Sequence, residues 1–376
     1  MFKQYEIKNY PFLLILNLIA ITGYGIILIG SAKHSVQRKQ ILGFALGMIV
    51  MLFISLLDYT IMLKFSAVYY AGVVALLLFV QLFGNDSHGA QRWIEIAGIQ
   101  FQPSEIAKIG IILFFAAFFE HFEGKINKPR NLILALVLAA VPMVLILAQP
   151  DTSTTIVCFF IFAVLLYLAG LSYKIILSVI GVCIPVGLVG IIYLFQNAAQ
   201  LIEDGHYQVK RIMSWLDPTN PLYSDYATQQ VNSVMAIGSG ELLGKGLNNT
   251  ASTSLKNANY IIEPQTDFIF AVAGEELGFI GTMLILVLIL LVILQCIYIG
   301  MRAQDLSGLL ICCGMAALIG FQTFVNICVA TGLMPNTGVT LPFVSYGLTS
   351  LVSLYIGMGF VLNVGLQPRK TKGGFV

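Results

Sequence analysis

The carboxylates best placed for catalysis gather at the start of one apolar segment. Asp267 lies in the run PQTDF at 264–268, and Glu275 and Glu276 follow within GEELG at 274–278. On a helix, Glu275 would lie about 12 Å along the axis from Asp267 and about 80° round it, whereas Glu276 would face roughly the opposite side. The spacing predicts that Glu275 shares a cavity with Asp267 and that Glu276 satisfies a neighbouring helix.

Asp267 has two interpretations at this level. As a helix cap, a carboxylate in the first turn gains about 0.3 to 1 kcal/mol from the helix dipole. As a general base at the edge of an apolar cavity, its pKa would be raised towards the working pH.

A second charged pair opens another apolar segment. Glu105 and Lys108 stand three residues apart, which places them on one helical face within reach of an ion pair. They are either a structural pair at a polar helix start or the charged wall of a substrate cavity. Residues 92–103 before them are amphipathic, and Pro103-Ser104 is typical of a helix start, so this helix is predicted to begin below the outer surface.

Several cations could hold an anionic group near these carboxylates, and the sequence does not rank them: Arg92, Lys108, Lys210, Arg211 and Lys245. The glycine-rich stretch 238–246 differs from a phosphate-binding P-loop, because Gly246 stands where Ser or Thr should bind magnesium. It is either a flexible loop or a backbone N–H cradle for a lipid-linked phosphate. Any cofactor is left open, a divalent cation beside such a phosphate being one option.

The elements that must position these residues are membrane helices. Of 376 residues, 58% are hydrophobic and 10% charged, too few charges for an ordinary soluble surface. The net charge of +2 gives no basic field for nucleic acid. Ten apolar segments approach the length that crosses a bilayer, and they lie near 11–30, 41–57, 65–83, 106–119, 131–148, 156–171, 174–195, 268–299, 306–331 and 348–364.

The distribution of Lys and Arg predicts that both termini are cytoplasmic. With the N-terminus inside, the inner segments hold 11 of these residues and the short outer loops hold 4, namely Lys33, Arg38, Lys39 and Arg92. Residues 196–266 then form a long outer loop with a helix near 227–237 and a turn at 217–221. Residues 334–347 hold two Pro and two Gly at membrane depth, which predicts a re-entrant segment lining a cavity.

The six cysteines lie inside apolar runs, and we interpret them as small buried residues. The four histidines are scattered without ligand spacing, so no metal site is indicated.

Four motifs occur in a fixed order: RWIEIAGIQFQPSEIAK at 92–108, QPDTST at 149–154, PQTDFIFAVAGEELGFIG at 264–281 and LMPNTGVTLPFVSYG at 333–347. Together they resemble the SEDS family (shape, elongation, division and sporulation), whose members include RodA, FtsW and SpoVE. The resemblance extends from the first apolar segment to Gln367. In one departure, Leu348 stands where many members have a second Gly.

The resemblance implies a single ten-helix membrane domain over residues 1–376 that acts as a peptidoglycan glycosyltransferase. It would polymerise lipid II on the outer face of the bacterial cytoplasmic membrane, beside a class B penicillin-binding protein that cross-links the strands. It also implies that Asp267 is the essential carboxylate and that Glu105 and Lys108 are important. Glu275, Ser345, Arg92, Arg211 and Lys245 are the expected supporting residues.

Two other functions stay open, a flippase for lipid-linked sugars and a non-catalytic scaffold. A flippase would need polar residues through the middle of several spans, yet the first, third, sixth and seventh are almost free of charge. The short termini favour a RodA-like or SpoVE-like member over relatives with long tails.

Overall fold

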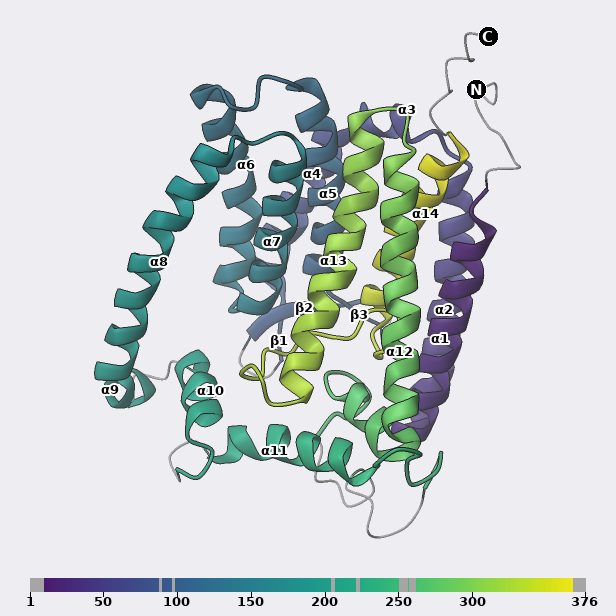
Figure 1. Ribbon diagram of the computed structural model, residues 1–376, viewed down its shortest axis with the longest axis vertical. Coiled ribbons are helices and arrows are strands. Elements are labelled where there is room, and N and C mark those ends of the chain that lie inside the picture. The colour runs from purple at the N-terminus through teal and green to yellow at the C-terminus, as the bar shows by residue number, and fades with distance from the viewer. Residues whose placement is uncertain are drawn as a thin grey trace. The chain divides into compact units, whose positions relative to one another are not determined.

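The structure, a computed structural model, describes residues 10–87, 90–96, 99–203, 207–220, 224–249, 256 and 262–367. Within these ranges eight helices are long and apolar enough to cross a membrane (Figure 1). They are α1 (Phe12–Ala32), α2 (His34–Ser55), α4 (Ser66–Phe83), α6 (Pro129–Ala148), α8 (Tyr173–Gln196), α12 (Ile269–Met301), α13 (Leu306–Ala330) and α14 (Leu348–Leu366).

Two further helices coincide with the remaining predicted spans. α5 (Pro103–His121) has 19 residues and carries Glu105, Lys108 and Glu120, while α7 (Thr152–Leu168) is an apolar helix of 17 residues. Each of the ten predicted segments therefore falls on a helix, and the polytopic helical fold class is confirmed. α5 begins at Pro103 as predicted. The first N–H groups of a helix have no acceptor within the helix, so a proline there, which lacks an N–H, loses no hydrogen bond.

One helix start differs from the prediction, and three strands were not predicted. α2 begins at His34 rather than near residue 41, since nothing in the charged turn breaks a helix and Lys33 alone is extended between α1 and α2. The amphipathic stretch before α5 forms strands: β1 (Asn85–Ser87), β2 (Ala90–Ile96) and β3 (Ile99–Phe101) pair antiparallel in the order β1-β2-β3. A short helix, α3 (Tyr59–Leu63), lies between α2 and α4.

The chain divides into two compact units. The first comprises Met1–Gly170, Leu284–Thr323 and Pro342–Val376, and the second comprises Leu171–Met283 and Phe324–Leu341. α12 and α13 each contribute to both units. The prediction of a single membrane domain over residues 1–376 stays a prediction.

Within the first unit, glycine allows α2 and α14 to approach closely. A Cβ at Gly47 would lie 2.6 Å from the ring of Tyr355, and one at Gly359 would lie 2.9 Å from the Cβ of Ile54. Small residues serve this purpose between membrane helices, where close backbone contact replaces the hydrophobic driving force. The hydroxyl of Tyr355 then hydrogen-bonds to that of Thr22 at 2.9 Å, so its one polar group is satisfied inside the core.

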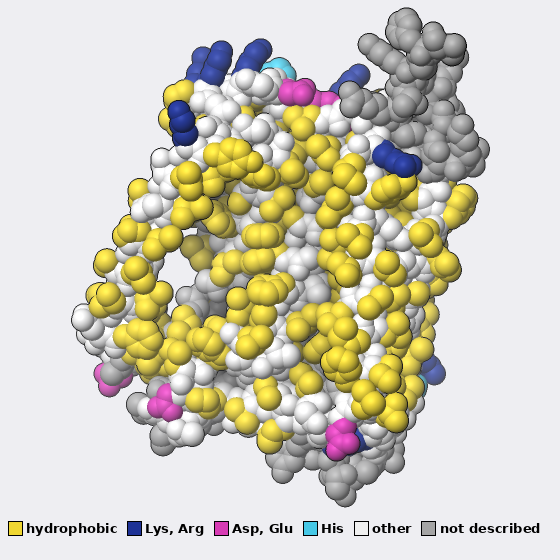
Figure 2. Space-filling view, viewed as in Figure 1, with side chains coloured by type: hydrophobic (Ala, Val, Ile, Leu, Met, Phe, Trp, Pro, Cys, Tyr) yellow, Lys and Arg dark blue, Asp and Glu magenta, His cyan; other side chains and the backbone are white. Residues whose placement is uncertain are grey.

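The outward faces of the helices are apolar, as a bilayer requires. Figure 2 shows hydrophobic side chains, in yellow, over the helices on the side of the molecule that faces the viewer. α8 is the extreme case, because none of its residues is buried. It carries Cys183, which is exposed, so the interpretation of every cysteine as buried is wrong at this position. Cys313 is partly buried, and Cys158, Cys296, Cys312 and Cys328 are buried.

The loop between α8 and α12 contains three helices in the second unit: α9 (Ala198–Glu203), α10 (Tyr207–Leu216) and α11 (Ser224–Ser239). α11 confirms the helix predicted near 227–237. It lies against the end of α13, where Gln230 donates to the carbonyl oxygen of Val329 at 2.8 Å and Ser233 donates to that of Ala330 at 2.8 Å. Of the predicted turn at 217–221, residue 221 lies outside the described residues, and a turn is present before it.

The segment between α13 and α14 has no regular helix, as its prolines and glycines predict. Leu341, Phe343 and Val344 are nevertheless buried. Irregular backbone among spanning helices is tolerated where protein surrounds it. Its second part belongs to the first unit, in which Gln40 donates to the carbonyl oxygen of Ser345 at 3.2 Å and accepts from the backbone N–H of Gly347 at 3.4 Å.

Candidate active site

Asp267 lies just before α12 and is not its cap. The carbonyl oxygen of Phe268 accepts the first helical bonds, from Ala271 at 2.9 Å and Val272 at 3.3 Å. Phe268 is therefore the capping position, one residue after Asp267. Among the described residues no donor is hydrogen-bonded to the Asp267 carboxylate. No contact therefore supports the capping interpretation, and both carboxylate oxygens can accept a hydrogen bond or a proton from a bound molecule.

The environment of Asp267 changes its proton affinity. Burial raises the pKa of its carboxyl from 3.8 to about 6, the nearby Glu263 raises it further, and the guanidinium of Arg211 opposes both effects. A pKa near neutrality lets the carboxylate accept a proton during a reaction and release it afterwards.

Two neighbours border Asp267 within the second unit. The side-chain amide of Asn326, on α13, donates to the carbonyl oxygen of Asp267 at 2.8 Å and to that of Val339 at 2.7 Å. Gly338 has φ +73°, and a Cβ there would lie 3.5 Å from Oδ2 of Asp267 and 4.0 Å from Nη1 of Arg211. The irregular segment after α13 therefore lines the site, and glycine keeps the space beside the carboxylate open.

Arg211 reaches the same place from α10. Its Nη1 donates to the carbonyl oxygen of Asn336 at 3.3 Å. The next turn of α10 is fixed by Trp215, whose indole N–H donates to the carbonyl oxygen of Gly332 at 2.8 Å. Of the predicted outer cations, Arg211 is thus the one whose charge acts on Asp267.

Glu275 and Glu276 are both engaged by lysines of the long loop. Nζ of Lys245 lies 3.1 Å from Oε1 of Glu275, and Nζ of Lys256 lies 2.5 Å from Oε1 of Glu276. The backbone N–H of Lys256 also donates to Oε2 of Glu275 at 3.3 Å. Glu276 is therefore paired with a lysine of the long loop, and the prediction that it satisfies a neighbouring helix stays a prediction. Lys245, one of the predicted cations, forms an ion pair with Glu275.

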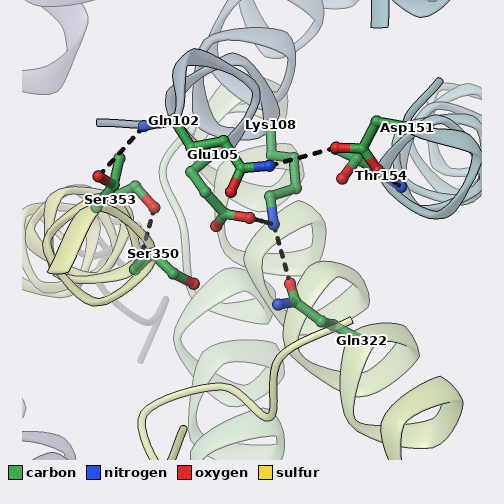
Figure 3. Close-up of polar contacts among 9 residues, drawn as sticks. Gln102, Glu105, Lys108, Asp151, Thr154, Gln322, Ser350 and Ser353 are labelled. Atoms are coloured by element: carbon green, nitrogen blue, oxygen red, sulfur yellow. Dashed lines mark hydrogen bonds and ion pairs between the residues drawn. The ribbon is translucent and has the colours of Figure 1, made fainter. Parts of the chain in front are cut away.

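In the first unit, Glu105 and Lys108 form the predicted ion pair on the first turns of α5 (Figure 3). Nζ of Lys108 lies 2.8 Å from Oε1 of Glu105 and donates to Oε1 of Gln322 at 3.2 Å. Their exposed fractions are 7% for Glu105 and 3% for Lys108. The other carboxylate oxygen of Glu105 is buried without a hydrogen-bond partner in the described structure, so it has capacity for one more donor.

A second polar group borders this pair. Gln102 donates to Oδ2 of Asp151 at 3.3 Å, and Oδ1 of Asp151 accepts from the backbone N–H of Thr154 at 3.2 Å, which caps α7. Arg92, on β2, donates to the carbonyl oxygens of Gln149, at 2.9 Å, and Pro150. Arg92 thus fixes the backbone before α7, and this use of its guanidinium was not predicted.

The structure groups the predicted residues by unit. Asp267 and Arg211 come together in the second unit, where Glu275 pairs with Lys245; Glu105, Lys108, Arg92 and Ser345 lie in the first. Sequence reasoning missed Asn326, Gln322 and Lys256. Asn326 and Gln322 were detectable, because they stand four residues apart in an otherwise apolar helix, where polar side chains are costly.

Among the described residues no group of three His, Cys, Asp or Glu side chains could hold a metal ion.

The apolar helices and the buried charged side chains together define the class of protein. It is a multi-pass membrane protein with ionisable groups buried beside its helices. A family model described as a cell cycle protein, for FtsW, RodA and SpoVE, matches residues 5–370, and the chain belongs to this family.

Its relatives include named enzymes. The probable peptidoglycan glycosyltransferase FtsW of Geobacter sp. (strain M18) is 32% identical over 383 residues, covering 97% of this chain and 99% of the relative. The peptidoglycan glycosyltransferase MrdB of Escherichia coli (strain K12) is 34% identical over 357 residues, covering 93% and 92%. A solved structure described as "Structural coordination of polymerization and crosslinking by a peptidoglycan synthase complex" holds a similar chain, with 28% identity, a TM-score of 0.76 and coverage of 95% and 97%.

Proposed function

We propose that this protein is a peptidoglycan glycosyltransferase that polymerises lipid II into glycan strands. One observation carries the proposal: a carboxylate with a pKa raised to about 6 lies beside a guanidinium, in a site lined by Gly338 and free of capping contacts. Membership of a family with relatives named as peptidoglycan glycosyltransferases supplies the substrate class.

In the proposed reaction, one residue takes up the proton of the attacking hydroxyl and another stabilises the leaving group. A sugar hydroxyl oxygen bonds to the anomeric carbon of a second lipid-linked sugar, and the bond from that carbon to the pyrophosphate oxygen breaks. Asp267 accepts the hydroxyl proton, since its raised pKa makes it a better base than an exposed carboxylate. Arg211 is the first candidate to stabilise the charge on the departing polyprenyl pyrophosphate, because a guanidinium can bind two phosphate oxygens at once.

Glu105, Lys108 and Ser345 have supporting roles in this proposal. A buried ion pair with one unpartnered carboxylate oxygen can hold a donor group of a sugar or peptide. Glu275 and Lys245 keep the long loop against α12 and so maintain the shape of the site around Asp267.

The reaction is proposed for the outer face of a bacterial cytoplasmic membrane, with both termini inside, because the charge distribution along the sequence favours that orientation. A class B penicillin-binding protein is the proposed partner. The similarity to a chain from a complex that coordinates polymerisation and crosslinking supports this choice.

The decisive experiment uses the purified full-length protein and purified lipid II, with and without the cognate single-span transpeptidase. Glycan polymers should form, and their rate should rise with the partner. Movement of lipid II between leaflets of a vesicle without any polymer would instead favour a flippase. Neither polymer nor movement, from a protein that still binds its partner, would favour a scaffold.

A further inference from the structure

A short loop of the second unit is bound along α12 where that helix is interrupted. At Gly278 the backbone leaves the helical conformation, with φ +65° and ψ −160°. Residues 240–247, here called the strap, lie against this break. Phe279 donates its backbone N–H to the carbonyl oxygen of Glu241 at 2.9 Å, and Ile280 donates to that of Leu242 at 3.3 Å.

The strap is held from both sides of the break. The backbone N–H groups of Lys245 and Gly246 donate to the carbonyl oxygens of Glu275 and Glu276, each at 2.9 Å. A Cβ added at Gly244 would collide with the carbonyl oxygen of Glu276. The position of the strap along α12 is therefore fixed by backbone contacts and by the absence of a side chain at Gly244.

The leucines of the strap point away from the protein. Leu242 is 59% exposed and Leu243 is 74% exposed, and Leu247 is exposed as well. On α12 the residues that bond to the strap have equally exposed side chains, 58% for Phe279 and 54% for Ile280. Strap and helix thus form one continuous apolar surface, and α12 is a membrane span by its length and hydropathy.

The depth of this surface follows from the length of the helix. Arg302 lies 4.2 Å over the ring of Tyr298 at the far end of α12, an arrangement typical of a membrane interface. A hydrocarbon layer of ~30 Å takes about 20 helical residues. Counted back from Tyr298, that length reaches Phe279, the first residue after the break. The break and the strap therefore lie at the boundary between lipid and water.

We propose that the strap is a membrane-interface anchor: Leu242, Leu243 and Leu247 insert into the lipid leaflet on the side of the long loop. The occupant of this surface is bilayer lipid, because the leucines extend the lipid-facing side of a spanning helix at the level where the hydrocarbon begins. Lys245, in the same strap, is paired with Glu275 and stays at the depth of the lipid head groups. The anchor does not depend on the reaction proposed above.

Site-directed spin labelling of the full-length protein in nanodiscs of phosphatidylethanolamine and phosphatidylglycerol tests this anchor. Cys183 and Cys313, which are not fully buried, are first replaced by serine. Labels then go singly at Leu243→Cys, at Ile280→Cys as the lipid-facing reference, and at Thr219→Cys, in an exposed turn, as the aqueous reference. Collisions with oxygen, which partitions into lipid, are compared with collisions with a water-soluble nickel chelate.

The ratio of oxygen to nickel collisions at position 243 should match that at 280 and exceed that at 219 several-fold. A ratio equal to that at 219 would overturn the anchor. So would protection from nickel that arises only when the transpeptidase is added, since the occupant would then be protein. A label at Leu242→Cys repeats the measurement if the first variant does not fold.

A second variant tests the function of the leucines. With the label at Asn249, replacing Leu242 and Leu243 together by serine should increase the mobility of the label, because the strap loses its hold on the leaflet. Leu291→Ser, an exposed leucine further along α12, is the matched control and should leave the mobility unchanged. Equal spectra from both variants would count against anchoring by the leucines.

Discussion

Asn326 ties Asp267 to the segment that lines its site. A single side-chain nitrogen donates to the carbonyl oxygen of Asp267 at 2.8 Å and to that of Val339 at 2.7 Å, and Asn326 itself is buried on α13. The backbone that carries the carboxylate and the backbone beside Gly338 are therefore held by the same amide group.

Replacing Asn326 should disturb both segments. In Asn326→Leu a buried carbonyl oxygen, that of Val339, and a part-buried one, that of Asp267, lose their donor. A buried acceptor left without a donor costs about 1 to 3 kcal/mol, so the melting temperature should fall. Because Asp267 is then less well fixed, the acidic limb of the pH–rate profile should also shift. Thr323→Val is the matched control, since the Thr323 hydroxyl is buried without a partner in the described structure and should lose little. Equal melting temperatures for the two variants would contradict this role.

Asp267→Asn separates catalysis from stability. Asparagine keeps the size of the side chain but provides no basic oxygen, and a general base contributes about 100- to 10,000-fold in rate. Glycan formation from lipid II should fall by that factor while the protein remains folded. The measurement pairs a polymerisation assay with thermal melting in detergent. Near-normal product from a folded variant would remove Asp267 as the base, and Glu275 would be tested next.

The rate should depend on pH through Asp267. Its carboxyl must be ionised to accept a proton, and its pKa is about 6, so the rate should be constant above pH 7 and fall about tenfold per pH unit below 6. A profile with an acidic limb near pH 4, the value of an exposed carboxylate, would show that burial does not act on the reacting group.

The same shift has a consequence of opposite sign for stability. Because the folded-state pKa lies above the unfolded value of 3.8, the folded state binds the proton more tightly between these values. The contribution of Asp267 to stability therefore falls as the pH rises from 4 to 6. Asp267→Asn should melt higher than the parent at pH 7, with an advantage that shrinks as the pH is lowered towards 4. An advantage that grows towards low pH would reverse the sign and contradict the shift.

Glu105 and Lys108 should behave as one unit. Removing either charge leaves its partner buried and unpaired, at a cost of about 3 to 5 kcal/mol, whereas removing both avoids this penalty. Glu105→Ala, Lys108→Ala and the double variant should therefore lose similar activity and stability. Arg130→Ala, at an exposed position, is the control and should be neutral. Additive losses from the single changes would assign the two residues separate roles.

Orientation can be measured by labelling single cysteines with a membrane-impermeant reagent. In a background without the native cysteines, Thr219→Cys in the long loop should react in intact cells, and Lys125→Cys between α5 and α6 should react only after the membrane is broken. Both positions are exposed in the structure. The reverse pattern would place the site of Asp267 on the cytoplasmic side and remove the proposed outer-face reaction.

The sequence by itself determined the helices and the family. Long apolar runs bounded by polar residues predicted ten segments that fall on helices, and Pro103 fixed the start of α5, because hydropathy and helix-start signals are local properties of the chain. The pair Glu105 and Lys108 was predictable for the same reason, since three residues separate them on one helix.

Only the tertiary structure decided how the remaining charges are used. Lys245 and Glu275 are 30 residues apart, Lys256 and Glu276 are 20 apart, and Asn326 and Asp267 are 59 apart. Contacts across such separations depend on how loops fold back onto helices, and no local periodicity encodes them. The interpretation of Asp267 also depended on the tertiary structure. Its position before an apolar run was compatible with a helix cap, but Phe268 is the capping residue, and the Asp267 carboxylate lies beside Arg211 and Gly338. The proton affinity of a side chain is set by the burial and charge that the whole fold assembles around it.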